Sequence, residues 1–160
     1  EAYRQIVGKF PSQSSLTIAG GFQSDNDEAE FTALIEGEQS IKYVGIADFD
    51  LKSQLLADSH IFCLPTYYLY EGQPISILEA YASGCVVIST DHAGIPDIFD
   101  HSNGHVVDKS SVQSLVSSFE KIMTDRNFSL RTALYNNEFF SQNFREKNFS
   151  NRIREIIIEN

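Results

Sequence analysis

Short apolar runs rich in β-branched residues alternate along the sequence with longer stretches of helical character. Each of the first four runs ends at a Gly, Pro or Thr, as expected for strands buried on both faces of a sheet. Because strands that alternate with helices of this length are joined by crossover connections, they pair in parallel. The sequence therefore predicts an α/β fold with a doubly wound parallel sheet and flanking helices. The predicted strands are 15–20, 41–45, 60–65, 85–90 and 104–107, and the predicted helices among them are 25–38, 50–58 and 74–83.

Helices alone are predicted from residue 111 to residue 160. Apolar side chains between 112 and 123 have the spacing of one helix face, and a second apolar stripe follows near the end of the chain. We expect some of these helices to cover the sheet, and the second stripe to be exposed where another domain would cover it. That stripe consists of Phe149, Ile153, Ile156 and Ile157.

The chain begins at "EAYRQIVGKF", which has the pattern of the second half of a helix. The length of 160 residues, with 42% hydrophobic residues, suits one sizeable core and not two ordinary domains. We therefore interpret residues 1–160 as a single domain truncated at its N-terminal edge, with its first strand absent.

The charge and hydropathy of the chain limit the kinds of molecule that it is expected to bind and the compartment in which it is expected to lie. A formal net charge of −10 repels nucleic-acid backbones, so nucleic acid is not expected as a partner. No apolar run approaches the roughly 18 residues of a membrane span, and no secretory signal is evident, so the domain is expected to be cytoplasmic. Cys63 and Cys85 lie in strand-like runs without metal-ligand spacing and are predicted to be reduced core thiols.

The stretch "YEGQPISILEAYASG" at residues 70–84 is the candidate anion site. It follows the third predicted strand, and in open parallel sheets ligands bind beyond the carboxyl ends of the strands. Pro74 suits the first turn of a helix, so the free N–H groups nearby would present the positive end of the helix dipole. Glu71 precedes this helix end and Glu79 lies five residues after Pro74, roughly 7 to 8 Å along the axis at ~1.5 Å per residue. A diphosphate bound there would have one carboxylate on each side.

The helix pattern places Glu79 at the edge of the predicted buried arc. Such a border position can desolvate a carboxylate enough for it to accept two ribose hydroxyl hydrogen bonds while it remains ionised. The simpler alternative, and the favoured one on spacing alone, is that both glutamates are solvated residues attracted by the helix dipole. The predicted arc consists of Ile75, Leu78, Tyr81 and Ala82.

The longer stretch "YEGQPISILEAYASGCVVISTDHAGIPDIF" resembles the signature of the retaining GT-B glycosyltransferases of the family-four, or group 1, type. The shared elements are a Glu, seven residues and a second Glu, then a small-residue turn, a Val-Val strand and a loop with Gly-x-Pro and an acid. In this sequence they are Glu71, Glu79, Ser83-Gly84, Val86-Val87 and Ala93 to Asp97. The ordered set is far more specific than the two glutamates alone.

The resemblance implies the C-terminal, Rossmann-like half of a GT-B fold, which binds a nucleoside-diphosphate sugar. It implies transfer of the sugar with retention to a glycan or lipid-linked acceptor in bacterial polysaccharide or lipopolysaccharide synthesis, with no cofactor and no metal. Glu71 would contact the donor sugar as the catalytic carboxylate, and Glu79 would contact the ribose. The backbone of Gly72, Gln73, Pro74 and Ile75 would meet the sugar and diphosphate, and the loop from Gly45 to Asp48 would lie near the base.

Two parts of the family pattern are missing or changed. The N-terminal acceptor domain is absent, and the family's phosphate-binding Arg and Lys would lie upstream of Glu1, so this chain alone is expected to be inactive. Any place at the inner face of a membrane would depend on the missing half. Gln73-Pro74 replaces the family's Phe-Gly, and Asp97 replaces its more usual Glu.

Several alternatives remain at this stage. A non-catalytic nucleotide-sugar-binding module would share these residues, whereas a sugar-nucleotide epimerase or phosphorylase lacks the ordered set, and a receiver-like signalling domain would need an Asp after its third strand. His101 and His105 are separated by an Asn103-Gly104 turn, which disfavours a metal site. His92, in the loop after the fourth strand, could contact the donor or be a solvated loop histidine, and the loop tyrosines between 67 and 70 could flank a ligand or serve packing.

Overall fold

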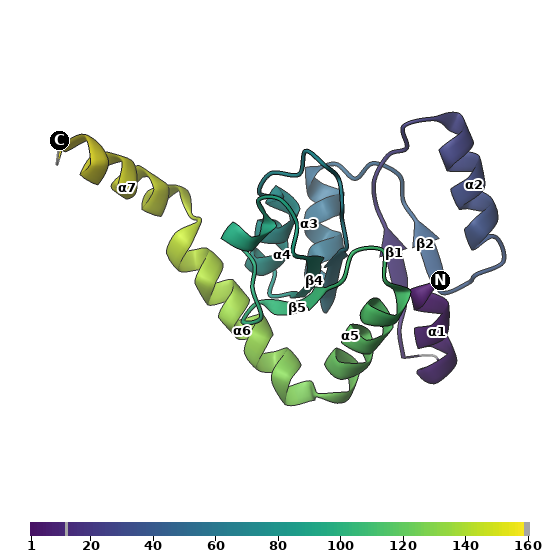
Figure 1. The fold of residues 1–160 in the computed structure, drawn as a ribbon. Coiled ribbons are helices and arrows are strands. Elements are labelled where there is room, and N and C mark those ends of the chain that lie inside the picture. The colour runs from purple at the N-terminus through teal and green to yellow at the C-terminus, as the bar shows by residue number, and fades with distance from the viewer. Residues whose placement is uncertain (12, 159–160) are drawn as a thin grey trace. The chain divides into compact units, whose positions relative to one another are not determined.

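Parallel strands pair in two separate ladders (Figure 1). The computed structural model describes residues 1–11 and 13–158, without the side chains of residue 149 and of residues 155–158. The chain divides into two compact units, Glu1–Leu55 and Leu56–Asn160, and each contains one ladder. The α/β class with parallel strands, predicted from the sequence, is confirmed.

The first unit contains a two-stranded parallel ladder and its helices. Strand β1 pairs with β2 in the register Thr17 opposite Lys42. The Ser24 hydroxyl caps α2 by accepting a hydrogen bond of 3.2 Å from the Asp27 N–H. The elements are α1 (Ala2–Lys9), β1 (Leu16–Ile18), α2 (Asp25–Ile35) and β2 (Ile41–Tyr43), and α3 (Phe49–Ala57) continues into the second unit.

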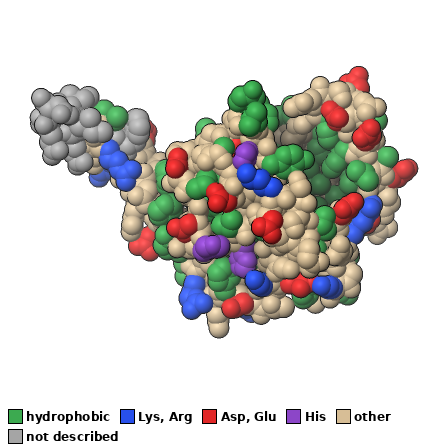
Figure 2. Space-filling model, viewed as in Figure 1, with side chains coloured by type: hydrophobic (Ala, Val, Ile, Leu, Met, Phe, Trp, Pro, Cys, Tyr) green, Lys and Arg blue, Asp and Glu red, His purple; other side chains and the backbone are tan. Residues whose placement is uncertain are grey.

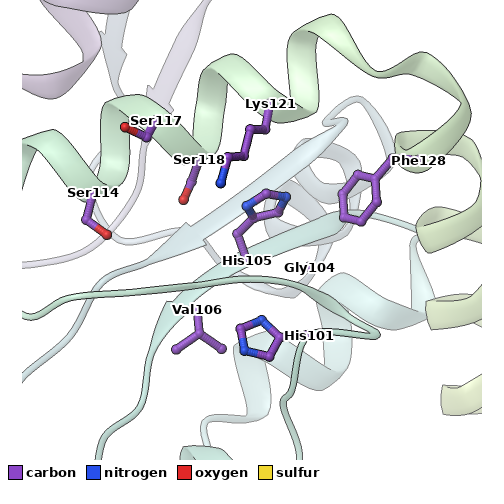
Figure 3. Close-up of a pocket in the computed structure, with 9 residues that line it drawn as sticks. All are labelled: His101, Gly104, His105, Val106, Ser114, Ser117, Ser118, Lys121 and Phe128. Carbon is purple, nitrogen blue, oxygen red and sulfur yellow. The ribbon is translucent and has the colours of Figure 1, made fainter.

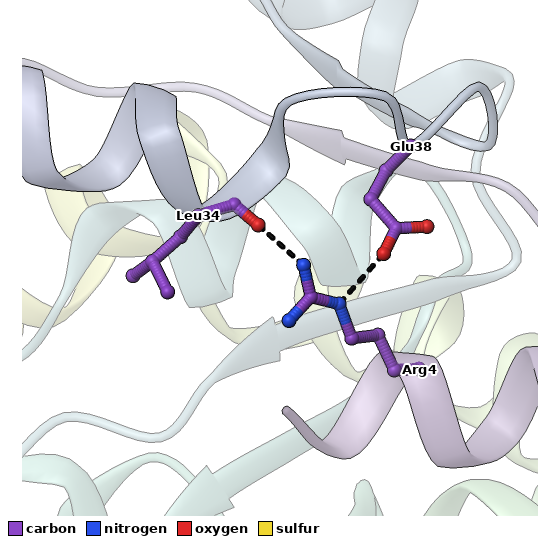
Figure 4. Close-up of polar contacts among 3 residues, drawn as sticks. All are labelled: Arg4, Leu34 and Glu38. Carbon is purple, nitrogen blue, oxygen red and sulfur yellow. Dashed lines mark hydrogen bonds and ion pairs between the residues drawn. The ribbon is translucent and has the colours of Figure 1, made fainter.

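Arg4 connects α1 to the end of α2 (Figure 4). Its guanidinium donates one hydrogen bond of 2.5 Å to the Leu34 carbonyl and another of 2.6 Å to the Glu38 carboxylate. Because the ion pair is partly exposed, it contributes on the order of 1 kcal/mol or less. The interaction positions α1 more than it stabilises the unit.

The second unit is built around β4, whose five residues are all buried. The ladder order is β3-β4-β5, with Phe62 opposite Val87 and Ser89 opposite Val106. The elements are β3 (Ile61–Leu64), α4 (Ile75–Ala82), β4 (Val86–Thr90), η1 (Ile95–Asp97), β5 (Gly104–Val107), α5 (Val112–Thr124), α6 (Arg126–Asn143) and α7 (Glu146–Ile158).

Helices cover both faces of this ladder. Successive side chains of a strand point to opposite faces, and on β4 they enter two different apolar clusters. Val87 packs with residues of α4 and the aromatic side chains of α6, whereas Val86 and Ile88 pack with Ile122 of α5. The doubly wound arrangement therefore holds within the second unit, with α4 and α6 on one face and α5 on the other.

The predicted buried arc of α4 is wrong at Ile75. Ile75 is 70% exposed, while Ile77 and Ala80 are fully buried. Only Tyr81 is fully buried as predicted, and its hydroxyl donates to the Ile98 carbonyl at 2.9 Å. Helix α4 packs against α6 as well as against the sheet, so its buried face is not the one that contact with a sheet alone predicts.

None of the described helices is long and apolar enough to cross a lipid bilayer. On α7, Ile153 is 40% exposed. The other members of the predicted apolar stripe, Phe149, Ile156 and Ile157, lie outside the described side chains, so its exposure stays a prediction.

A buried asparagine on α6 joins the helix to the starts of β4 and β5. The Asn136 side-chain amide donates to the Cys85 carbonyl at 2.7 Å and to the Asn103 carbonyl at 2.9 Å. Its oxygen accepts from the Asn103 side-chain amide at 2.9 Å. Asn136 is fully buried, so all of its polar atoms depend on these partners. The adjacent Gly104 has φ +155°, and a Cβ there would lie 1.8 Å from the Val87 carbonyl oxygen.

We predict that Asn136→Ala lowers the free energy of unfolding by about 3 kcal/mol, because it leaves buried carbonyl and amide groups without partners. The matched control is Asn137→Ala, since Asn137 is exposed and makes a single hydrogen bond, of 2.6 Å, to the Ala82 carbonyl. The control should cost less than about 1 kcal/mol. Urea unfolding followed by circular dichroism measures both, and equal losses would contradict the role given to Asn136.

Both cysteines are free thiols inside the second unit, as predicted. Burial raises the pKa of the Cys63 thiol to about 12 and that of Cys85 to about 11. The Cys85 thiol also donates to the Leu56 and Ser59 carbonyls, both at 3.4 Å.

We predict that neither thiol reacts with a disulfide reagent in the folded protein at pH 8, and that both react after unfolding in urea, because only the thiolate attacks. Since the folded pKa values are raised, stability should fall as the pH rises above the unfolded thiol pKa of about 8.5. The absorbance of the thiol that the reagent releases measures the rate at which each cysteine reacts. A thiol that reacts in the folded protein as fast as a free cysteine would contradict this account.

Candidate functional site

The carboxyl ends of β3 and β4 lie side by side and are clamped by hydroxyl groups. Their parallel register places Leu64 opposite Ser89. The Ser89 hydroxyl donates to the Leu64 carbonyl at 2.8 Å, and the Thr90 hydroxyl donates to the Thr66 carbonyl. Two loops therefore leave the same edge of the sheet, 65–74 before α4 and 91–94 before η1, where ligands bind in open parallel sheets.

Side chains of the second loop and of η1 hold the first loop in place. The His92 imidazole Nε2 lies 2.8 Å from the Tyr68 carbonyl oxygen, so the ring carries its proton on Nε2 and donates it. The Gln73 side-chain amide donates to the Asp97 carboxylate at 3.4 Å. His92 therefore helps to hold the first loop in place. The sequence alone did not decide whether His92 contacts a ligand or solvent.

The backbones of the two loops meet at Gly94 and Gly72. A Cβ built on Gly94 would lie 2.7 Å from the Gly72 carbonyl oxygen and 2.9 Å from its carbon. Gly94 has an ordinary φ of −84°, so the close contact and not the backbone conformation requires a glycine. The preceding Ala93 has φ +49°, a conformation that non-glycine residues seldom adopt outside tight turns. The loop from Ala93 to Asp97 is part of the family signature, but the sequence does not predict the contact between Gly94 and Gly72.

Helix α4 begins where the first loop ends, as the sequence predicted. Pro74 is buried as its N-cap, and the Ile77 N–H donates to the Pro74 carbonyl at 3.0 Å. The first turn of α4 contains no acidic residue, in contrast to α2, whose first turn contains three. The positive end of the α4 dipole is therefore not neutralised from within its own first turn, which favours an anion there.

The two glutamates lie on either side of this helix start in the sequence and are both partly buried. The Glu71 N–H donates to the Tyr68 carbonyl at 3.0 Å, which closes a turn just before α4. Glu79 is half-buried on α4, and its place at the edge of the buried face stays a prediction. Its contacts with a ribose, and those of Glu71 with a sugar, stay predictions.

The remaining predicted contacts divide between the two units. Gln73 and Ile75 belong to the second unit with the glutamates, and both are exposed beside the α4 start. Gly45 and Asp48 belong to the first unit. Gly45 has φ +70° and accepts from the Gly20 N–H at 2.9 Å.

The Asp48 carboxylate has a local structural role. It accepts from the Leu51 N–H at 2.9 Å and so caps the start of α3. A contact with the nucleotide base stays a prediction for this loop.

Four consecutive large side chains on the first loop are exposed, and the Tyr68 and Tyr70 rings pack edge to face with centroids 5.9 Å apart. An amphipathic surface of this kind suits sugar or base stacking as well as protein contact. Among the described residues no group of three or more His, Cys, Asp and Glu side chains could hold a metal ion. The exposed residues are Tyr67, Tyr68, Leu69 and Tyr70.

We predict that Gly94→Ala lowers the free energy of unfolding by about 1 to 3 kcal/mol, because the new methyl group forces two backbones apart. Gly72→Ala is the matched control, since no atom lies within 4 Å of a Cβ at that position. It should change stability by less than about 0.5 kcal/mol. Chemical unfolding of both variants tests the contact, and equal stability of the two would refute it.

The sequence model of the family described as Glycosyl transferases group 1 matches residues 1–125. Among curated proteins, the amylovoran biosynthesis glycosyltransferase AmsK of Erwinia amylovora is 31% identical over 93 residues, 54% of this chain and 23% of its own. The putative colanic acid biosynthesis glycosyltransferase WcaL of Salmonella typhimurium is 29% identical over 111 residues, 64% of this chain and 27% of its own. This chain thus spans about a quarter of the length of these relatives.

Solved structures share the fold. Anabaena HepE, crystallised with UDP-glucose, superposes with a TM-score of 0.81 at 18% identity, over 99% of this chain and 44% of that one. The C-terminal domain of LpcC, a group 1 glycosyl transferase of Francisella tularensis, gives 0.77 at 22% identity, over 91% and 76%. These likenesses confirm the predicted fold, and the family match over residues 1–125 shows that the chain belongs to the group 1 glycosyl transferases.

Proposed function

We propose that this chain is the donor-binding part of a retaining glycosyltransferase, which moves a sugar from a nucleoside-diphosphate sugar to a glycan or lipid-linked acceptor in bacterial polysaccharide or lipopolysaccharide synthesis. The observation that carries the proposal is the start of α4, free of acids in its first turn and placed at the carboxyl edge of the sheet between two clamped loops. The relatives named for amylovoran and colanic acid biosynthesis and the HepE structure with UDP-glucose support it.

The diphosphate would accept hydrogen bonds from the backbone N–H groups of Gly72, Gln73, Ile75 and Ser76, because Pro74 has no N–H and that of Ile77 donates to the Pro74 carbonyl. As the bond to the anomeric carbon breaks, negative charge grows on the leaving diphosphate, and the fixed N–H groups and helix dipole stabilise that charge. Gly94 acts on this step indirectly, because its contact with Gly72 fixes the backbone that carries the N–H groups. The reaction as proposed requires no metal.

The two glutamates divide recognition of the donor between them. Glu79 would accept hydrogen bonds from the ribose hydroxyls, and Glu71 would accept from hydroxyls of the sugar at the reacting end. Each carboxylate would repel the negatively charged diphosphate. The arrangement is therefore stable only if hydroxyl groups of the donor lie between each carboxylate and the phosphates. The loop from Gly45 to Asp48 would lie near the base.

Acceptor binding would come from the rest of a longer protein, since the chain spans only part of its relatives. Alone it is expected to bind the donor and not to transfer the sugar. The complete enzyme would act in the cytoplasm, at the inner face of the membrane if its other half binds there.

The test separates the two glutamates by calorimetric titration of the 160-residue chain. The titrants are uridine, guanosine and adenosine diphosphates and the glucose esters of these diphosphates. Comparison of their dissociation constants identifies the base that binds tightest. Glu79→Gln should weaken binding of both the diphosphate and its sugar ester by roughly tenfold or more, because a charge-assisted hydrogen bond is lost. Glu71→Gln should weaken only the sugar ester, because the diphosphate lacks the group that Glu71 contacts.

Glu146→Gln is the matched control, since Glu146 is exposed on α7 and the substitution removes the same charge. It should leave both affinities unchanged. Thermal unfolding provides a second readout, since a ligand at a hundred times its dissociation constant adds about 2.7 kcal/mol of stability. Unchanged affinities in both Glu71 and Glu79 variants would refute the proposed roles.

A further inference from the structure

A concave site lies in the second unit, along β5 and α5 and apart from the candidate donor site (Figure 3). This β5 pocket has a volume of about 380 Å³. Its lining comes from His101, from Gly104–Val106, from the face of α5 between Ser114 and Lys121, and from Phe128. It shares no residue with the two loops at the carboxyl edge of the sheet.

The charged and titratable side chains that line the β5 pocket are all basic. They are His101, His105 and Lys121, and no Asp or Glu of the described part of the chain lines the pocket. This is unusual in a chain with 22 acidic and 12 basic residues. Burial, together with the nearby charges of Lys121 and His101, lowers the pKa of His105. Like charges that repel one another without a carboxylate among them create a site that an anion would stabilise.

Serine hydroxyls add hydrogen-bond donors to the same wall. The Ser114 Oγ accepts from the Asp108 N–H at 3.1 Å, and the Ser117 Oγ accepts from the Gln113 side-chain amide at 3.4 Å. A hydroxyl that accepts a hydrogen bond still has its own hydrogen to donate. Ser118 is buried on the same helix face, and Figure 3 shows its side chain beside the Lys121 ammonium, which reaches toward His105.

The Phe128 ring adds an apolar wall and fixes the histidine. It packs edge-on to the His105 imidazole, with centroids 5.1 Å apart and an interplanar angle of 88°. Its lowered pKa leaves this imidazole neutral at neutral pH, when it still donates one N–H. The pocket is larger than one phosphate group requires, so the apolar ring of Phe128 can cover a small organic part.

We propose that the β5 pocket binds a phosphate monoester, with the phosphate held by Lys121, His105 and the serine hydroxyls of α5. A lysine ammonium with hydroxyl and imidazole donors is a suitable ligand set for a phosphate dianion, whereas a metal cation would be repelled by Lys121. The phosphate could belong to a free small metabolite or to a phospholipid head group, and the experiment distinguishes the two. The proposal does not depend on the donor site.

The test follows backbone amide signals of the 160-residue chain by nuclear magnetic resonance. Glucose 6-phosphate is titrated in the presence of a saturating concentration of whichever nucleoside diphosphate binds tightest in the calorimetric titration, so that the proposed donor site is occupied. Saturable shifts at Gly104–Val106 and between Ser114 and Lys121 are expected. Inorganic phosphate should produce the same shifts more weakly, because it lacks the organic part.

Lys121→Gln should weaken this binding by roughly tenfold, the loss expected for a charge-assisted hydrogen bond. Lys109→Gln is the matched control, because Lys109 is exposed, does not line the pocket and loses the same charge. Both lysines are exposed, so neither substitution should unfold the protein. A vesicle arm compares phosphatidic acid in phosphatidylcholine with phosphatidylcholine alone, and binding of the former in a Lys121-dependent way assigns the phosphate to a lipid.

Three results would overturn the proposal. One is the absence of saturable shifts with every probe at millimolar concentration. Another is equal weakening by Lys121→Gln and Lys109→Gln, which would indicate unspecific attraction. The third is a set of shifts confined to Gly72–Ile77, which would mean that the ester binds only beside α4.

Discussion

The backbone contact between Gly94 and Gly72 is the constraint on which the candidate site depends. It brings the loop after β4 against the loop before α4 at a distance that no side chain at position 94 would allow. The hydrogen bonds from His92 to Tyr68 and from Gln73 to Asp97 then fix the same two loops on either side of that contact. Because these loops carry the first N–H groups of α4, their fixed position is what would make an anion site rigid before a ligand arrives.

Buried polar contacts at the other end of the strands help to fix the carboxyl edge of the sheet in the second unit. Asn136 ties α6 to the starts of β4 and β5, at the opposite end of the strands from the two loops. β4 is buried along its whole length, between α4 and α6 on one face and α5 on the other (Figure 1). A strand held in this way at both ends cannot shift its register without losing buried hydrogen bonds, so the loops at its carboxyl end keep their places.

Much of this arrangement could be predicted because its signals are local. The β-branched runs that gave β3, β4 and β5, and Pro74 as the start of α4, depend only on neighbours in the sequence. The buried face of α4 could not be predicted in the same way, because α6 lies more than forty residues further along the chain and competes with the sheet for that face. Ile75 was therefore wrongly assigned to the core.

Residues with two plausible roles were the hardest to interpret from the sequence. Asp48 was assigned to a ligand loop, and the structure shows that its carboxylate caps α3, a role that a single loop position does not reveal. The role of Asn136 could not be predicted, because one asparagine inside a helix gives no sign of its buried partners. The two histidines beside the Asn103-Gly104 turn were considered only as metal ligands, yet they line a pocket with Lys121.

The two proposed anion sites differ in the groups that would hold the ligand. Acidic side chains prevail over much of the chain, and in Figure 2 Asp and Glu are spread across the visible face, with His and Lys or Arg grouped over part of it. At α4 the proposed anion site would rely on backbone N–H groups and a helix dipole, whereas the β5 pocket would rely on the Lys121 ammonium with hydroxyl and imidazole donors. If both proposals hold, an acidic protein would bind negative ligands in two independent ways.

The most direct test of the central claim is a crystal structure of the chain with a nucleoside-diphosphate sugar. The account predicts diphosphate oxygens within hydrogen-bond distance of the N–H groups of Gly72, Gln73, Ile75 or Ser76, with the Glu79 carboxylate on the ribose and the Glu71 carboxylate on the sugar. A diphosphate bound elsewhere, or a bound donor that neither carboxylate touches, would contradict it.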